Sequence, residues 1–444
     1  MALTPQFLRA LEDIVGPAGL VVSAEGRLTY ECDMHTFYKG TPDAVVLPES
    51  AEQVAAIVRL CRREHVPIVP RGSGTGLINL WLSQATRERG YFFAPDPSSQ
   101  MVSSIGGNAS TNAGGPHCLK YGITVNHVLG LEVVTGAGEL VQLGGKTHER
   151  PGYDLTGVMV GAEGTLGLVT GVIVRLTHLP EGVKTILASF PTIEDASEAV
   201  SAIIRAGIIP AALEMLDEVV IRAIEEGVGA GYPKGAGAVL LIELDGPTAE
   251  IDAQSGPIEA ICRDHLALEI RVAQSEAERA LLWKGRKEAA GVFGRLTPNW
   301  LLQDAVVPRS KLPQIMKEVA AIGARHRLVI ANVFHAGDGN LHPLICYDDR
   351  VPGELERAKQ ANEELLGACL RLGGSVTGEH GVGLDKRASL PMQFADADLN
   401  FMARLRRVFD PDSIMNPGKL LPSHPACGEG FRPAARPLPA GTWI

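Results

Sequence analysis

The sequence predicts an α+β protein with more than one domain, on three observations. Its 444 residues exceed the length at which a single hydrophobic core stops growing. Segments with strand character alternate with segments of helical periodicity along most of the chain. Glycine is frequent, with 50 residues, and it gathers in loops between these segments. Such loops let the backbone approach a ligand closely, so the fold is expected to hold a large cofactor.

The first clear elements precede the first glycine loop. Asp43–Pro48 is predicted to be a strand, and Ser50 to cap a helix from about Ala51 to Glu64 with an apolar face. Val66–Pro70 is predicted to be the next strand, which would complete a β-α-β unit. The loop that follows reads GxGxG and not GxGxxG, and no acidic residue is well placed for a ribose. NAD is therefore a poor prediction.

Glycine forms three clusters in the N-terminal half: Pro70–Gly76, Ser104–Gly115 and Gly161–Gly167. Backbone amides in such loops can surround a phosphate or lie against a flat ring. Any one cluster alone is more simply explained by turns in a β-rich domain. The three together predict a large cofactor lying along the chain.

Composition excludes several classes of function. The formal net charge is -10 without a lysine or arginine cluster, which argues against nucleic acid and anionic membrane as partners. The seven cysteines are scattered and form no CxxC pair, so a disulfide framework and a cysteine-run iron–sulfur site are not expected. We find no signal peptide and no apolar stretch of membrane-spanning length. The expectation is a soluble, cytoplasmic protein.

Two motifs near the C-terminal end carry the densest chemistry. One runs from His335 to His342 (HAGDGNLH), and the other is Gly378–Gly381 (GEHG). Two imidazoles and the carboxylate of Glu379 are ligands that suit zinc, manganese or iron, and His380 would be a base beside them. The chemistry predicted is activation of a small oxygenated substrate.

The predicted local structure agrees with a metal site. Leu328–Phe334 and Leu341–Cys346 resemble buried strands, and Asp338-Gly339 between them is a hairpin turn signal. A hairpin would bring His335 and His342 close together across the turn. The alternative is that two ordinary histidines flank a hairpin that binds no metal.

Seven motifs follow one another along the chain: RGSGTG (71–76), PDPSS (95–99), IGGN (105–108), NAGG (112–115), GAEGTLG (161–167), HAGDGNLH (335–342) and GEHGVG (378–383). In this order they resemble the motifs of the FAD-linked 2-hydroxyacid dehydrogenases related to vanillyl-alcohol oxidase. The similarity extends from about Asp43 to Lys419 and is strongest to the glycolate oxidase and D-lactate dehydrogenase branch.

The resemblance implies a flavin-binding domain of two subdomains, of the vanillyl-alcohol oxidase or PCMH type, and a C-terminal cap domain. We expect an N-terminal helical segment over 1–42, the flavin domain over 43–180, the substrate and metal domain over 181–422, and a loose tail over 423–444. Strand and helix patterns alternate after Lys184. The cap is therefore expected to be a mixed sheet with helices on one side.

The resemblance also implies which residues bind FAD. The loop 71–76 would hold the pyrophosphate through backbone amides, a second group would line the rest of the cofactor, and Asn416 would bring the C-terminal part of the chain back to the flavin. The predicted FAD-binding residues are Arg71, Gly72, Ser73, Gly74, Thr75, Gly76, Pro97, Ser98, Ser104, Gly107, Asn108, Glu163, Gly164 and Asn416.

The implied reaction is oxidation of a small 2-hydroxy acid to the 2-oxo acid. Arg286 would hold the carboxylate, a divalent metal on His335, His342 and Glu379 would lower the pKa of the α-hydroxyl, and His380 would take the proton as hydride passes to flavin N5. The electrons would go to a separate iron–sulfur subunit or another acceptor. Such a partner could place the protein peripherally at the inner membrane.

Two departures from the family pattern open alternatives. After Leu77 the chain enters the helix predicted over Asn79–Arg89 almost directly, where relatives have further strands. A block on the order of forty residues is missing relative to the family pattern, so one alternative is an inactive variant that acts only as a binding subunit.

Leu344, two residues after His342, favours glycolate or D-lactate over D-2-hydroxyglutarate. A D-2-hydroxyglutarate dehydrogenase is a second alternative. A metal-dependent hydrolase without flavin is a third.

Overall fold

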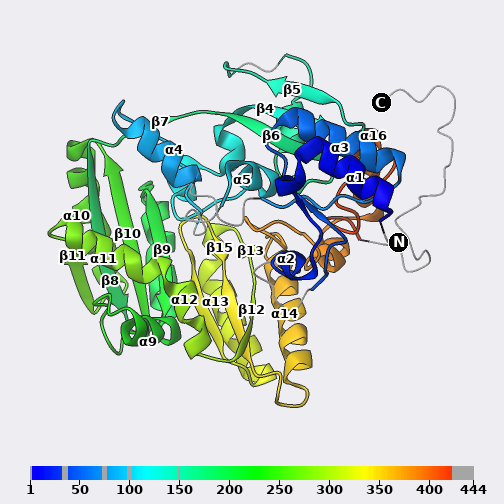
Figure 1. Cartoon of the computed structure of the whole chain (residues 1–444). Helices are drawn as coiled ribbons and strands as arrows, with labels where there is room; N and C mark the ends of the chain where they lie inside the picture. The colour runs from blue at the N-terminus through cyan, green and yellow to red at the C-terminus, as the bar shows by residue number, and fades with distance from the viewer. Residues whose placement is uncertain (1–2, 33–38, 73–77, 98–102, 149–150, 423–444) are drawn as a thin grey trace, which may run out of the picture. The chain divides into compact units, whose positions relative to one another are not determined.

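The computed structural model describes residues 3–32, 39–72, 78–97, 103–148 and 151–422. The chain forms two compact units, and each is assembled from separated stretches of sequence (Figure 1). Unit 1 comprises Met1–Arg71, Val128–Val174 and Ala397–Ile444. Unit 2 comprises Gly72–His127 and Arg175–Asp396. The predicted loose tail after residue 422 lies outside the described residues.

Unit 1 contains short helices and two small sheets. Strands β1 and β2 form one sheet, and the other has the order β5-β4-β6. Its elements are α1 (Pro5–Val15), η1 (Pro17–Gly19), β1 (Leu20–Val21), α2 (Ala24–Leu28), β2 (Val45–Val46), α3 (Ala51–Arg63), β4 (Val128–Thr135), β5 (Leu140–Gly144), α7 (Leu155–Met159), β6 (Gly167–Val174) and α16 (Asp396–Phe409).

Helix α3 is confirmed, including its cap, since the Ser50 side chain accepts a hydrogen bond from the amide of Gln53. The predicted β-α-β unit is wrong. Strand β2 pairs antiparallel with β1, and the segment 66–70 forms no extended ladder, only a parallel bridge from Ile68 to Met415. Pro67 and Pro70 limit this segment because neither has an amide hydrogen to donate to a ladder.

Unit 2 is built on one large sheet in the order β11-β8-β10-β9-β14-β15-β13, with β16 pairing with β14 and β12. The strands of this sheet are β8 (Gly182–Phe190), β9 (Ala212–Asp217), β10 (Ala238–Gly246), β11 (Glu269–Val272), β12 (Asn299–Leu302), β13 (Ala305–Val306), β14 (Ile330–His335), β15 (Asn340–Leu341) and β16 (Pro343–Tyr347). Strands β3 (Tyr91–Phe92) and β7 (Thr177–His178) form a separate two-stranded sheet.

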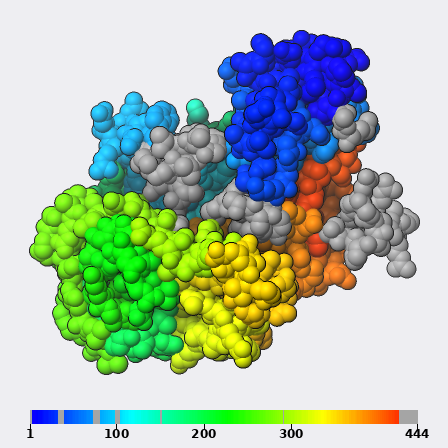
Figure 2. Space-filling model, turned by 60° about the horizontal axis from the view of Figure 1, so that its bottom comes forward, coloured from blue at the N-terminus to red at the C-terminus, as the bar shows by residue number. Residues whose placement is uncertain are grey.

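Unit 2 also contains helices, and the residues from β8 to α14 form a continuous surface, green to yellow in Figure 2. The helices are α4 (Ile78–Arg87), α5 (Ile105–Thr111), α6 (Cys118–Tyr121), η2 (Thr124–His127), α8 (Ile193–Arg205), α9 (Glu218–Gly227), α10 (Thr248–Asp264), α11 (Glu276–Lys287), α12 (Ala289–Val292), η3 (Phe293–Arg295), η4 (Arg309–Lys311), α13 (Leu312–His326), α14 (Glu354–Arg371), η5 (Arg387–Ser389) and α15 (Leu390–Gln393).

The strand directions in the large sheet differ from the expectation of a mixed sheet. Each pair that the structure describes there is antiparallel. Strand β10 lies between β8 and β9, so two strands that are consecutive in the chain are not neighbours in the sheet. This insertion leaves every strand beside one that runs in the opposite direction.

Helices cover both faces of the sheet, and the expectation of a single covered face is wrong. Successive side chains of β9 point to opposite faces. Met215 meets α8, where the Ser197 hydroxyl lies 3.9 Å from its sulfur, while Glu214 binds Arg286 of α11. The strands are accordingly buried along nearly their whole length. A fully covered strand offers a dry setting for the charged side chain of Glu214.

Candidate active site

The predicted hairpin exists and carries two of the candidate ligands. His335 ends β14 and pairs with Asn340 of β15, while β16 returns antiparallel to β14. The turn passes through Gly339 at φ 80°, which favours glycine. The two histidine rings meet edge to face with centroids 5.1 Å apart. The hairpin therefore sets both imidazoles beside each other, as predicted.

Glu379 completes a buried cluster with these histidines. Its Oε1 lies 3.2 Å from His335 Nε2 and 3.0 Å from His342 Nε2. One ligand atom from each of the three side chains lies within 4.8 Å of the others. Burial alone would raise the pKa of Glu379, but His335 and His342 outweigh it and hold that pKa well below its usual range. The carboxylate is ionised at neutral pH.

The GEHG loop is held in place by Asp304, a fully buried residue. Its Oδ2 accepts hydrogen bonds from the amides of Gly378 at 2.9 Å and His380 at 3.0 Å, and its Oδ1 accepts from the amide of Glu379 at 3.0 Å. Lys386 Nζ donates to the same carboxylate at 2.9 Å. Three successive amides and an ammonium thus fix the backbone that presents Glu379 and His380.

His380 lies beside the cluster without joining it closely. Its ring stacks on that of His342, with centroids 4.9 Å apart and planes 14° from parallel, and 38% of its side chain is exposed. The atoms packed around the rest of the ring desolvate it, which lowers its pKa to about 4. The ring is neutral at pH 7 and can accept a proton.

Arg286 reaches the cluster from α11 and is 5% exposed. Its guanidinium forms an ion pair with Glu214 at 2.6 Å and lies 3.5 Å from His335 Nδ1. Glu214 in turn lies 2.8 Å from the same Nδ1. A guanidinium has five N–H donors, so Arg286 keeps donors beyond those that bind Glu214.

The donor set of His335, His342 and Glu379 fits a divalent metal. Two imidazole nitrogens and one carboxylate are the protein ligands typical of catalytic zinc and related metals. Glu379 Oε2 is buried and has no hydrogen-bond partner among the described residues, as a group intended for a ligand would. A second geometric grouping joins Asp304 with His342 and His380, but Asp304 is already occupied by the amides and Lys386.

Three of the FAD-binding residues predicted in unit 2, Ser104, Gly107 and Asn108, lie in one short segment. Ser104 caps α5 and accepts a hydrogen bond from the amide of Gly107 at 3.0 Å. A Cβ on Gly72 or on Gly107 would lie 2.9 Å from the Ser104 hydroxyl, so both positions favour glycine. Asn108 is buried and its amide nitrogen has no partner among the described residues. This unpaired donor fits a cofactor that offers acceptors. Pro97 is also buried.

The residues predicted in unit 1 form a separate group. Asn416 donates to the carbonyl oxygen of Glu163 at 2.7 Å, and its own side-chain oxygen is buried without a partner in the described chain. Gly164 has φ 69° and a Cβ there would lie 2.3 Å from Pro70. Arg71 instead donates to the carbonyl of Cys32 at 3.0 Å. The predicted residues Ser73, Gly74, Thr75, Gly76 and Ser98 lie outside the described residues.

Sequence reasoning missed Glu214, Asp304 and Lys386. Two of them left a signal, because each acidic residue stands alone in an apolar strand segment, ALEML for Glu214 and LLQDAVV for Asp304. A buried carboxylate needs a partner, so an isolated acid in such a segment predicts a charged site. Lys386 left no such signal.

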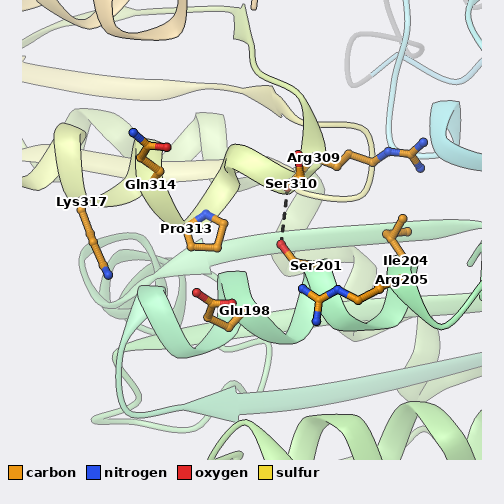
Figure 3. A pocket seen from close by; sticks show the side chains of 9 residues that line it. All are labelled: Glu198, Ser201, Ile204, Arg205, Arg309, Ser310, Pro313, Gln314 and Lys317. Atoms are coloured by element: carbon orange, nitrogen blue, oxygen red, sulfur yellow. Dashed lines mark hydrogen bonds between the residues drawn. The ribbon is translucent and has the colours of Figure 1, made fainter. Parts of the chain in front are cut away.

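A groove of about 480 Å³ lies on the other helix layer, away from this cluster (Figure 3). Ser201 of α8 donates to the carbonyl of Arg309 at 3.4 Å across it, and Arg205 and Lys317 add positive charge. None of the predicted site residues lines this groove, so the site argued above does not depend on it.

Sequence models of two domain families match the chain. The model described as FAD linked oxidases, C-terminal domain, matches residues 179–420, and the FAD binding domain matches residues 42–81 and 79–144. The chain belongs to the FAD-linked oxidases. It is an FAD-dependent oxidoreductase, and the family predicted from its motifs is confirmed.

Two relatives cover nearly the whole chain. Glycolate oxidase subunit GlcD of Escherichia coli is 40% identical over 459 aligned positions, which take in 95% of this chain and 92% of the relative. A probable mitochondrial D-lactate dehydrogenase of Danio rerio is 31% identical and covers 95% of this chain and 92% of its own length. The resemblance to this branch of the family is therefore confirmed.

The fold class is confirmed by a solved structure. The crystal structure of p-cresol methylhydroxylase with substrate bound superposes with a TM-score of 0.75 at 14% identity, covering 93% of this chain and 96% of that one. At this identity the likeness concerns the fold alone.

Among the described residues, no helix is both long enough and apolar enough to cross a membrane.

Proposed function

We propose that this FAD-linked oxidase oxidises a small 2-hydroxy acid, glycolate or D-lactate, to the 2-oxo acid with the help of a divalent metal. The observation that carries the proposal is the buried cluster of His335, His342 and Glu379 with an unpaired carboxylate oxygen, beside a neutral His380. The names of the glycolate oxidase and D-lactate dehydrogenase relatives support the substrate class.

Each residue of the site has a role in this proposal. When bound, FAD supplies the hydride acceptor and a divalent metal on His335, His342 and Glu379 supplies Lewis acidity. Arg286 binds the substrate carboxylate through guanidinium donors that Glu214 does not use. His380 accepts the hydroxyl proton at an imidazole nitrogen as hydride leaves the α-carbon. Burial of the cluster strengthens these electrostatic interactions.

Leu344, which the sequence predicts to favour a small substrate, is completely buried and belongs to the same hydrophobic core cluster as Val333 and Cys346. Its position gives no separate argument for one substrate over another. The choice between small hydroxy acids and D-2-hydroxyglutarate therefore depends on direct comparison of substrates.

A second candidate is an inactive deletion variant that serves as a binding subunit. The FAD binding domain matches in two pieces that meet at residues 79–81, where the sequence predicts the deletion. The alignment with GlcD has 459 positions against 444 residues in this chain, so it contains gaps on this chain's side. The two matched pieces support a missing block in the flavin domain, and the gaps in the alignment are consistent with it.

In either case we propose a partner subunit. The relative GlcD is named as a subunit, and the scattered cysteines of this chain provide no iron–sulfur site of its own. The electrons would pass to a separate iron–sulfur or other acceptor subunit, with the protein in the cytoplasm or peripheral at the inner membrane.

The visible absorption spectrum of the purified protein separates these candidates. Flavin bands that bleach on anaerobic addition of glycolate or D-lactate, and less with D-2-hydroxyglutarate, are the expected result. Colourless, folded protein that does not respond to added FAD would overturn catalysis and favour the binding subunit. Bleaching by D-2-hydroxyglutarate alone would overturn the proposed substrate class.

A further inference from the structure

We propose that Glu214 is a positioning residue that orients His335 toward the metal and Arg286 toward the substrate carboxylate at the same time. The inference rests on the proposed function, because it assigns a residue that would hold the metal ligand and the carboxylate-binding group in one arrangement. No motif predicted this residue.

The contacts of Glu214 are divided between the two groups. Its Oε1 and Oε2 lie 2.8 and 2.9 Å from His335 Nδ1, and Oε2 accepts from Arg286 Nε at 2.7 Å and Nη2 at 2.6 Å. Its side chain has no exposed surface. Water therefore does not compete for the carboxylate, and both partners are fixed by one rigid strand residue.

The bond to His335 selects the state of that ring. When Nδ1 donates its hydrogen to Glu214, the lone pair of a neutral imidazole is on Nε2, the nitrogen that faces Glu379. Metal-bound histidines commonly donate their second nitrogen to a carboxylate, which fixes the ring orientation and makes the ligand more basic. Glu214 stands in that relation to His335.

The neighbouring strand provides a matched control residue. Glu243 of β10 is also buried and also accepts from an arginine of α11, since Arg279 Nε lies 3.0 Å from its Oε2. It binds His117 and Trp283 instead of a candidate metal ligand. Loss of either glutamate removes a buried charge from the same helix–sheet interface, but only Glu214 contacts the metal cluster.

The test measures zinc affinity by competition with a chelator for wild type, Glu214→Gln and Glu243→Gln, with the flavin spectrum and thermal unfolding recorded for each. We expect Glu214→Gln to lose roughly 10–100-fold in zinc affinity, while Glu243→Gln loses stability but binds zinc as wild type does. Equal zinc affinity in wild type and Glu214→Gln would overturn the inference, as would wild type that binds no zinc.

A variant that removes both charges guards against misfolding. Glu214→Gln leaves Arg286 buried and unpaired, which is strongly destabilising, so the double variant Glu214→Gln/Arg286→Met is measured as well. It should fold and still bind zinc more weakly, because His335 lacks its carboxylate. Wild-type zinc affinity in that variant would overturn the inference. Zinc binding without bleaching by any 2-hydroxy acid would instead overturn the proposed function alone.

Discussion

Two clusters of charged side chains lie against the same helix, α11, and lead to different groups. In each, a glutamate on a central strand meets an arginine of α11 and a histidine: Glu214 with Arg286 and His335, and Glu243 with Arg279 and His117. In the second cluster both oxygens of Glu243 accept hydrogen bonds from protein donors. The first cluster continues through His335 to Glu379 and a second histidine, His342, whereas the second continues through His117 to Asp96. Glu379 Oε2 and Asp96 Oδ1 are both buried without a partner among the described residues.

This difference separates structure from function. A carboxylate beside a single histidine completes an ion-pair network, whereas a carboxylate shared by two imidazole nitrogens offers the ligand set of a divalent metal. The second cluster is also less buried, since 28% of the Arg279 side chain and 20% of that of His117 are exposed, against 6% for Arg286 and 2% for His335. The second imidazole and the deeper burial distinguish the first cluster, and the following variants test whether they do so in solution.

The largest effect is expected from Glu379→Gln. The substitution keeps the shape of the side chain but removes the anionic ligand, so we expect loss of bound metal and a fall in kcat of about 1,000-fold, or roughly 4 kcal/mol of transition-state stabilisation. Metal content by mass spectrometry and dye-linked turnover measure the two effects. The exposed Glu363→Gln is the control. Full metal occupancy in Glu379→Gln would show that Glu379 is not a ligand, and the proposed difference between the two clusters would then be wrong.

A smaller effect on the same cluster is expected from Asp304→Asn. The amide nitrogen of asparagine cannot accept from the backbone amides of the GEHG loop, so the hydrogen bonds to one of the two carboxylate oxygens are lost. Lys386 is also left without its anionic partner. We expect a loss of about 3 kcal/mol in the free energy of unfolding and weaker metal binding. Urea denaturation with and without zinc measures both, with Asp412→Asn as a surface control. Unchanged zinc affinity would show that the loop does not depend on this anchor.

His117→Gln should affect stability with a defined dependence on pH. Burial by itself lowers the pKa of His117, but Asp96 and Glu243 outweigh it and raise the pKa to about 10. The stability contributed by the charged ring is therefore complete below pH 6.5 and is lost as pH rises through 10. We expect the variant to lose about 1–3 kcal/mol at pH 6 and less at pH 9.5, with unchanged zinc affinity.

Chemical denaturation at the two pH values measures this dependence, and His265→Gln at the end of α10 serves as control. A larger loss at pH 9.5 than at pH 6 would contradict the charge assignment. Weaker zinc binding would contradict the purely structural role of the second cluster.

The smallest effect is expected from an exposed ion pair. Lys184 and Asp252 lie 2.9 Å apart, and 65% of the Asp252 side chain is exposed. Solvent screening limits such a pair to less than about 0.5 kcal/mol, so Lys184→Ala should leave the urea midpoint nearly unchanged. A loss comparable to that of His117→Gln would show that burial does not set how much an ion pair contributes to stability.

The sequence predicted those parts of the molecule that depend on local pattern. Helix α3 with its Ser50 cap and the hairpin between His335 and His342 were found because capping and turn residues act within a few positions. The pairing of Ile68 with Met415 and the contact of Glu214 with His335 could not be found in this way. Both depend on tertiary packing between distant segments, and no local pattern specifies such a register.

The pairing of Ile68 with Met415 also has a consequence for how the chain is made. About 350 residues separate the two partners, and Ile414 and Met415 pack in the same core as Val58. At about 5–20 residues per second on the ribosome, roughly 20–70 s pass between their synthesis. During that interval the nascent N-terminal segment lacks the side chains of Ile414 and Met415 that complete its core, and exposed apolar surface of this kind is prone to aggregate.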